Sequence, residues 1–269
     1  MIRLLDLTLP GDAQKKLDEY QGEINAIIDY AIRVEQAKAS FSSRNRRGNA
    51  TFDAIKETLT AMCAGAQRCA YCEDSAADEV EHIRPKNLYP EVVFVWFNYL
   101  YACGPCNGPK NSQFAVFDHT SGALVEVGRP RGAPVVPPLP GSPVLIDPRV
   151  EDPCAFMELD LRDTFWFVPR AKPGTTEYER ATYTIRALGL NVREYLPKAR
   201  QQAFKDYKAH LSHYRLKLEQ GAPRQHLRRL ERDIKQRQHP TVWSEMKRQQ
   251  EAIPSLAALF RAVPQALDW

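Results

Sequence analysis

Long apolar runs are absent from this sequence of 269 residues. No stretch of about 18 apolar residues occurs, so no segment is predicted to cross a membrane. The opening residues, MIRLLDLTLP, have too short an apolar core and no small-residue cleavage site for a signal peptide. Apolar residues still make up 43% of the chain and charged residues 26%, which excludes a disordered protein. We therefore expect a globular protein of the cytoplasm.

Cysteine is also scarce, with six residues in the whole chain. Disulfides are not expected in a reducing cytoplasm, where Cys-x-x-Cys pairs indicate metal or redox chemistry. Cys63 and Cys154 stand alone and are expected to be buried free thiols. The other four form two such pairs: Cys69 and Cys72, then Cys103 and Cys106. This spacing can hold a structural Zn²⁺ that closes the intervening segment into a loop.

Two other classes of cysteine protein fit the sequence poorly. The CGPC motif at 103–106 also occurs in thioredoxins, but these carry it after the first strand of an α/β domain, without a second cysteine pair. A zinc deaminase needs His-x-Glu followed by Pro-Cys-x-x-Cys, whereas here Glu81 precedes His82. A non-catalytic zinc ribbon that binds nucleic acid or protein stays open as the alternative.

The residues enclosed by the cysteines suit phosphodiester hydrolysis, which needs an activated water and charge neutralisation at the phosphate. Mg²⁺ prefers oxygen ligands, which Glu81 and Asn107 offer. Neutral His82 can take a proton from water, although neighbours on an ideal strand point to opposite faces. A bulge or a strand end is therefore needed to bring Glu81 and His82 together. Lys110 follows Asn107 by three residues and is predicted to reach the same phosphate.

This pattern resembles the HNH, or ββα-metal, endonucleases in the subgroup with zinc-knuckle cysteines. The resemblance implies that Glu81 is the acidic metal ligand and His82 the general base. It also implies that Asn98 braces the loop carrying the histidine and that Asn107 is the second ligand of a catalytic Mg²⁺ or Mn²⁺. The step from Asn98 to Asn107 and the following Lys110 resemble the HNH domains of RNA-guided CRISPR nucleases. The sequence departs from the family in having Glu81 where Asp is commoner.

Further segments extend the resemblance beyond the cysteine region. RCAYCE, EHIRPK, LIDPRVEDP and TIRALGLN occur in this order. The same order is seen in PtuB-like proteins, the HNH components of Septu and retron-associated antiphage defence systems. The resemblance implies a nuclease effector that cuts double-stranded DNA and works in a complex with an ATPase partner.

The predicted fold class is α+β, with a zinc-stabilised ββα-metal module embedded between helical regions. Apolar periodicity predicts one helix over 12–39, a loop over 40–49 and a second helix over 51–65. The module is expected to run strand, loop 86–97, strand 98–102 and helix from 104 or 105. The four predicted parts are a helical scaffold (1–66), the HNH module with its four-cysteine zinc site (67–128), a Pro-rich arm with a small β-element (129–175) and a basic helical domain (176–269).

The basic residues are concentrated in the last of these parts. The net charge of the chain is only +4, but residues 193–248 contain 15 Lys and Arg against 6 Asp and Glu. Such a segment suits DNA or another polyanion, and it equally suits a solvated helix face. The sequence alone leaves these two interpretations open, together with a role in binding the ATPase partner.

Overall fold

In a computed structural model, which describes residues 1–269, three helices form the N-terminal part. They are α1 (Gly11–Asn25), α2 (Tyr30–Arg44) and α3 (Ala50–Met62). The prediction of one helix over 12–39 was wrong, because the Asp29 side chain accepts the N–H of Ile32 at 2.9 Å and starts a new helix. Residues 40–44, predicted as loop, continue α2 and bury Phe41. The second predicted helix is confirmed as α3.

A two-stranded hairpin and a short helix follow. Strand β1 (Glu79–His82) pairs antiparallel with β2 (Tyr99–Ala102), and α4 (Gly104–Lys110) comes directly after. Two 3-10 turns, η1 (Pro90–Val92) and η2 (Trp96–Asn98), lie in the connecting loop. Pro105 occupies the first turn of α4, where its missing N–H costs nothing. The predicted order of strand, loop, strand and helix is present, with the second strand beginning one residue later than expected.

The middle of the chain adds two small sheets. Strands β3 (Ala115–Asp118) and β4 (Leu124–Glu126) form a hairpin, and β5 (Gly141–Pro143) pairs with the other edge of β3. The last residues of the Pro-rich stretch are thus extended and paired. A Cβ at Gly141 would collide with the carbonyl oxygen of Phe117, so this pairing requires glycine. Strands β6 (Met157–Leu159) and β7 (Phe167–Pro169) form the small predicted β-element.

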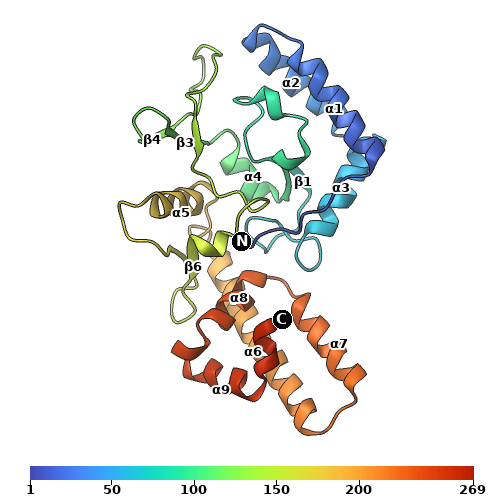
Figure 1. Ribbon diagram of the computed structural model, residues 1–269, viewed down its shortest axis with the longest axis vertical. Coiled ribbons are helices and arrows are strands. Elements are labelled where there is room, and N and C mark those ends of the chain that lie inside the picture. Colours follow the sequence, from blue (N-terminus) through green and yellow to red (C-terminus); the bar gives the residue numbers. More distant parts are fainter.

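The C-terminal part is helical, as predicted. It contains α5 (Thr176–Ala187), α6 (Tyr195–Glu219), α7 (Arg224–Lys235), α8 (Pro240–Arg248) and α9 (Pro254–Ala262). Gly221, with φ +69°, ends α6 and turns the chain into α7. The ring of Trp269 packs against Tyr214 of α6 at 4.8 Å. In Figure 1, α6–α9 gather at one end of the molecule, while α1–α3 flank the hairpin and α4 at the other.

The hairpin separates two apolar cores. Alternate side chains of β2 point to opposite faces: Tyr99 and Tyr101 enter a core made with α1–α3, whereas Leu100 and Ala102 enter a larger one. That larger core contains the four paired cysteines and the buried residues of the C-terminal helices. The fold is thus α+β and combines helices with small sheets around a cysteine cluster. The division into four parts stays a sequence-based prediction.

Candidate metal centre and polar pocket

The four paired cysteines converge on one point. All are buried, and their sulfur atoms lie within 4.8 Å of one another. Sγ of Cys72 and Sγ of Cys103 are 3.8 Å apart. A tetrahedral zinc site with Zn–S distances of about 2.3 Å has sulfur atoms about 3.8 Å apart. The donor set and the spacing of the sulfurs therefore fit a structural Zn²⁺.

Local backbone contacts bring the two cysteine pairs together. The first pair lies in a turn in which the N–H of Cys69 donates to the carbonyl of Ser75 at 2.9 Å. The second pair begins α4, where the N–H of Cys106 donates to the carbonyl of Cys103 at 2.9 Å. A bond of 3.0 Å from the N–H of Ala70 to the Tyr101 carbonyl attaches the first turn to β2. A metal here would clamp the segments that flank the hairpin.

The charge of the cysteine cluster is balanced by an arginine from the C-terminal part. Hydrogen bonds among the thiols lower the pKa of Cys72 and Cys103, and they raise the pKa of Cys69 and Cys106. Nη2 of Arg193 donates to Sγ of Cys106 at 3.2 Å. Four cysteinates around Zn²⁺ carry a net negative charge, which this guanidinium offsets. Sequence reasoning missed Arg193, whose only signal was its position just after the TIRALGLN segment.

A polar pocket of about 480 Å³ lies between α2, β1 and α4. It brings together Glu81, His82 and Asn107 of the predicted site. Asn98 and Lys110 do not line it. The complete lining consists of Lys38, Glu79, Glu81, His82, Pro85, Lys86, Asn87, Gly104, Asn107, Gly108, Asn111 and Ser112.

His82 is the last residue of β1, and the strand ends there. This end allows His82 and Glu81 to reach one pocket although neighbouring strand residues point to opposite faces. Nε2 of His82 lies 3.0 Å from the carbonyl oxygen of Val93. Because a carbonyl can only accept, Nε2 carries the proton and Nδ1 keeps a free lone pair. Burial lowers the pKa of His82 well below its usual value, so the ring is neutral at neutral pH.

Lys110 is completely buried behind this pocket. Its Nζ lies 2.5 Å from Oε1 of Glu81 and donates to the carbonyl of His82 at 2.9 Å. The prediction that Lys110 reaches a phosphate was therefore wrong: the side chain turns inward because it neutralises a buried carboxylate. Burial raises the pKa of Glu81, and Lys110 opposes this shift.

Two other lysines occupy the position expected of Lys110. Lys38 of α2 and Lys86 of the loop after β1 both line the pocket. Burial lowers the pKa of Lys86, and the nearby Glu81 carboxylate opposes this shift. Lys86 stands in the EHIRPK segment and could have been found from the sequence. Lys38 could not, because only the packing of α2 against the hairpin places it there.

Asn98 closes the loop that follows His82. Its Nδ2 donates to the carbonyls of Arg84 at 3.1 Å and Val92 at 3.0 Å, and its Oδ1 accepts the N–H of Arg84 at 2.8 Å. The loop so held contains Val93, the hydrogen-bond partner of His82. Asn98 thus ties together the two ends of the loop that follows the histidine, without entering the polar pocket.

Asn107 is oriented by a carboxylate that sequence reasoning missed. Nδ2 of Asn107 donates to Oε2 of Glu79 at 2.6 Å. The amide oxygen is therefore the end that remains for other partners. Glu79 could have been found from its spacing, because it precedes Glu81 by two residues and so shares its face of β1.

Similarity to known proteins covers only part of this chain. No family model matches the sequence. The Septu protein PtuB of Bacillus thuringiensis is 35% identical over 72 residues, which cover 25% of this chain and 28% of that protein. The chain thus aligns with little more than a quarter of the relative's length. None of the helices is both long and apolar enough to cross a membrane. In this aligned part, the chain is similar to a Septu protein.

Proposed function

We propose that this protein is a metal-dependent endonuclease of the HNH type that hydrolyses phosphodiester bonds in double-stranded DNA. One observation carries the proposal. A single polar pocket brings a neutral histidine with a free Nδ1, at His82, beside the carboxylate of Glu81 and the amide of Asn107. This combination supplies a proton acceptor next to two oxygen donors, as water activation at a phosphate requires.

The oxygen donors fit a Mg²⁺ or Mn²⁺ ion. Glu81 lines the pocket and forms an ion pair with Lys110 alone, so its carboxylate is an acidic donor available there. Asn107 is turned by Glu79 so that its oxygen remains available. When bound, such an ion would polarise the phosphate and stabilise the departing sugar oxygen.

His82 takes the proton from the attacking water at Nδ1. The Val93 carbonyl holds Nε2, which fixes the ring and its tautomer. Asn98 in turn fixes the loop that contains Val93, so it acts as a positioning residue. The ring stays neutral because burial lowers its pKa, and it can accept a proton across the neutral pH range.

Lys38 and Lys86 neutralise the phosphate that enters the pocket. Neither lysine forms an ion pair, and both line the pocket that holds Glu81 and His82. Lys110 contributes from behind by holding Glu81 in its ionised form. The four-cysteine cluster would hold structural Zn²⁺ and keep the hairpin and α4 in register.

In the cell, we place this nuclease as the cytoplasmic effector of an antiphage defence system that acts in a complex with an ATPase. The partial likeness to a Septu protein supports this role, together with the RCAYCE, EHIRPK, LIDPRVEDP and TIRALGLN segments. The basic C-terminal helices offer a surface for DNA or for the partner. A partner would also restrain a nuclease that is harmful when free.

The test compares plasmid nicking by the unaltered protein and by His82→Ala with Mg²⁺ or Mn²⁺ present. We expect nicking to be lost in this variant while zinc content and helicity are retained. His119→Ala, which removes a histidine from the exposed turn between β3 and β4, is the matched control and should nick normally. Equal nicking by His82→Ala would refute the proposed mechanism.

The second candidate is a non-catalytic zinc ribbon that binds nucleic acid or protein. The four-cysteine cluster favours it, because such clusters stabilise many binding modules that have no catalytic activity. The same assay separates the two functions: a binding module retains DNA in a gel-shift experiment and never nicks it, with or without Mg²⁺.

A further inference from the structure

A second cavity, of about 550 Å³, includes Asn98 in its lining and shares no residue with the polar pocket. Its walls come from the loop after β1, from β3 and β5, from residues 145–151 and from the start of α5. The volume is that of a site for a small ligand, and the lining is largely apolar with a few polar groups. Large apolar side chains remain in solvent at its edge, with Phe97 53% and Val150 59% exposed.

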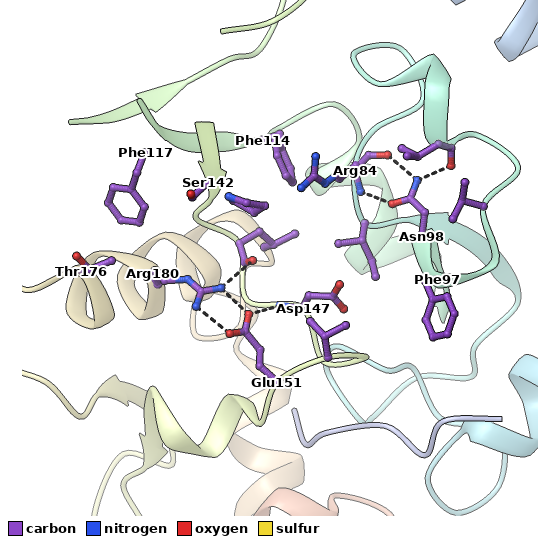
Figure 2. A pocket seen from close by; sticks show the side chains of 16 residues that line it. Arg84, Phe97, Asn98, Phe114, Phe117, Ser142, Asp147, Glu151, Thr176 and Arg180 are labelled. Atoms are coloured by element: carbon purple, nitrogen blue, oxygen red, sulfur yellow. Dashed lines mark hydrogen bonds and ion pairs between the residues drawn. The ribbon is translucent and has the colours of Figure 1, made fainter. Parts of the chain in front are cut away.

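Two polar groups of this cavity are already paired. Arg180 donates to Oε2 of Glu151 at 2.8 Å and to Oε1 at 2.5 Å, and Glu151 also accepts the N–H of Asp147 at 3.0 Å. Figure 2 shows the Arg180 and Glu151 side chains joined along one wall. The Arg180–Glu151 pair therefore holds the wall in place, and its hydrogen-bonding capacity is largely used.

Arg84 and Asp147 are different, because neither side chain forms an ion pair. The carboxylate of Asp147 accepts the N–H of Arg149 at 2.8 Å, and burial raises its pKa while the charges of Arg149 and Arg84 oppose that rise. The guanidinium of Arg84 lies 5.5 Å from the centre of the Tyr89 ring and forms no ion pair. Figure 2 shows Arg84 and Asp147 among the side chains around the cavity, without a hydrogen bond between them. A cation and an anion that line one largely apolar space can both bind a polar ligand placed between them.

We propose that this cavity binds a guanine base. Guanine presents a pair of acceptors, O6 and N7, which match the two-pronged guanidinium of Arg84. It also presents a pair of donors, N1–H and the N2 amine, which match the carboxylate of Asp147. Adenine carries an amine where guanine has O6, so it lacks the acceptor pair. Cytosine has a single amine and no ring N–H beside it, so it lacks the donor pair. The apolar walls take the faces of the ring, as aromatic and apolar side chains do around bases outside a duplex.

The base can come from a free guanine nucleotide or from a guanine extruded from a DNA strand. Both sources present the same ring, so the chemistry of recognition is shared. Asn98 lines this cavity and also holds the loop that follows His82, so a strand engaged at both sites would contact the same loop. The proposal itself needs only the cavity and does not depend on cleavage.

The test measures the binding of guanosine, inosine and adenosine 5′-monophosphates to the full chain by calorimetry, without added Mg²⁺. Inosine lacks only the N2 amine and should bind about tenfold or more weakly than guanosine, and adenosine weaker still. Equal affinities for the three, or no binding of the guanosine nucleotide, would overturn the proposal. His82→Ala should bind guanosine monophosphate as tightly as the unaltered protein does. Failure of the nuclease proposal would therefore leave this result unchanged.

Asp147→Asn provides the specificity test. The amide keeps the acceptor for the Arg149 N–H but replaces one acceptor facing the base with a donor. We expect guanosine monophosphate to bind about tenfold or more weakly. Xanthosine monophosphate, whose ring has a carbonyl where guanine has the N2 amine, should bind this variant better than it binds the unaltered protein. Asp163→Asn, an exposed carboxylate outside the cavity, is the control and should change neither affinity. If Asp147→Asn binds xanthosine monophosphate no better than the unaltered protein does, the contact between the base and Asp147 is refuted.

A competition experiment then identifies the source of the base. An oligothymidine strand with one central guanine is compared with plain oligothymidine as a competitor of bound guanosine monophosphate. Competition by the guanine strand alone assigns the cavity to DNA, and competition by neither strand assigns it to the free nucleotide. Equal competition by both strands would mean that the cavity does not read guanine, which contradicts the proposal.

Discussion

The ion pair between Lys110 and Glu81 gives the most direct test of how the site is held. Lys110→Met removes the charge while keeping a long unbranched side chain, so little cavity is created. Both groups are buried, and the Lys110 ammonium also donates to the His82 carbonyl. The variant therefore leaves a buried carboxylate without its cation and a strand end without its donor.

The expected loss in the free energy of unfolding of Lys110→Met is large relative to the stability of a domain. Breaking a buried ion pair by removing one partner costs about 3–5 kcal/mol, because the remaining charge stays desolvated. Ordinary domains are stable by about 5–15 kcal/mol, so the variant should fold only marginally. Urea unfolding followed by circular dichroism, in buffer without added divalent metal, gives the free energy of unfolding.

The pH dependence has a definite sign. Burial raises the pKa of Glu81 above its usual value of 4.5, and Lys110 opposes that rise. Without Lys110 the pKa rises further, so the folded variant holds the proton more tightly than the unfolded chain. The stability linked to this proton is present at pH values below the usual carboxyl range and is lost as the pH rises through the folded-state pKa. The deficit of the variant should therefore be smaller at about pH 5.5 than at about pH 8.

The matched control is Lys16→Met, because Lys16 forms an ion pair of the same 2.5 Å length with Glu19 on the exposed face of α1. Solvent screens that pair, so the midpoint of unfolding should not move. A Lys110→Met variant as stable as the control at about pH 8 would refute the reasoning that Glu81 is charged and dependent on Lys110.

Two further predictions concern the metal and the basic helix. The Cys72→Ser variant should bind no zinc, and its hairpin should be unfolded, because structural zinc binding supplies about 10–16 kcal/mol of folding free energy. A zinc-free variant with an unchanged circular dichroism spectrum would contradict the assignment of the four cysteines as zinc ligands. Changing Arg224, Arg228 and Arg232, which are exposed on one face of α7, to Gln should reduce the slope of log affinity for DNA against log salt by about 0.9 for each phosphate that is no longer neutralised. An unchanged slope would show that α7 does not hold DNA.

Sequence patterns predicted the elements of the site well, because they are governed by local rules. The cysteine spacing predicted the cluster, and alternation with turn residues predicted both hairpin strands and α4. Two positions depended on tertiary packing and were not predictable. Lys38 enters the polar pocket only because α2 packs against the hairpin, and Lys110 turns inward only because Glu81 is buried. The break at Asp29 was missed because the apolar spacing continues across it, while a single capping bond decides the helix start.

The hairpin that separates the two apolar cores has a consequence for synthesis on the ribosome. One face of β2 is covered by α1–α3, which emerge before it, but the other face packs in a core that includes residues as late as Ala266. Until those residues leave the ribosome, the face of β2 that carries Leu100 and Ala102 lacks part of its covering. All residues that line the polar pocket lie between Lys38 and Ser112, so they are made before the C-terminal helices, whereas the cysteine cluster gains Arg193 only later.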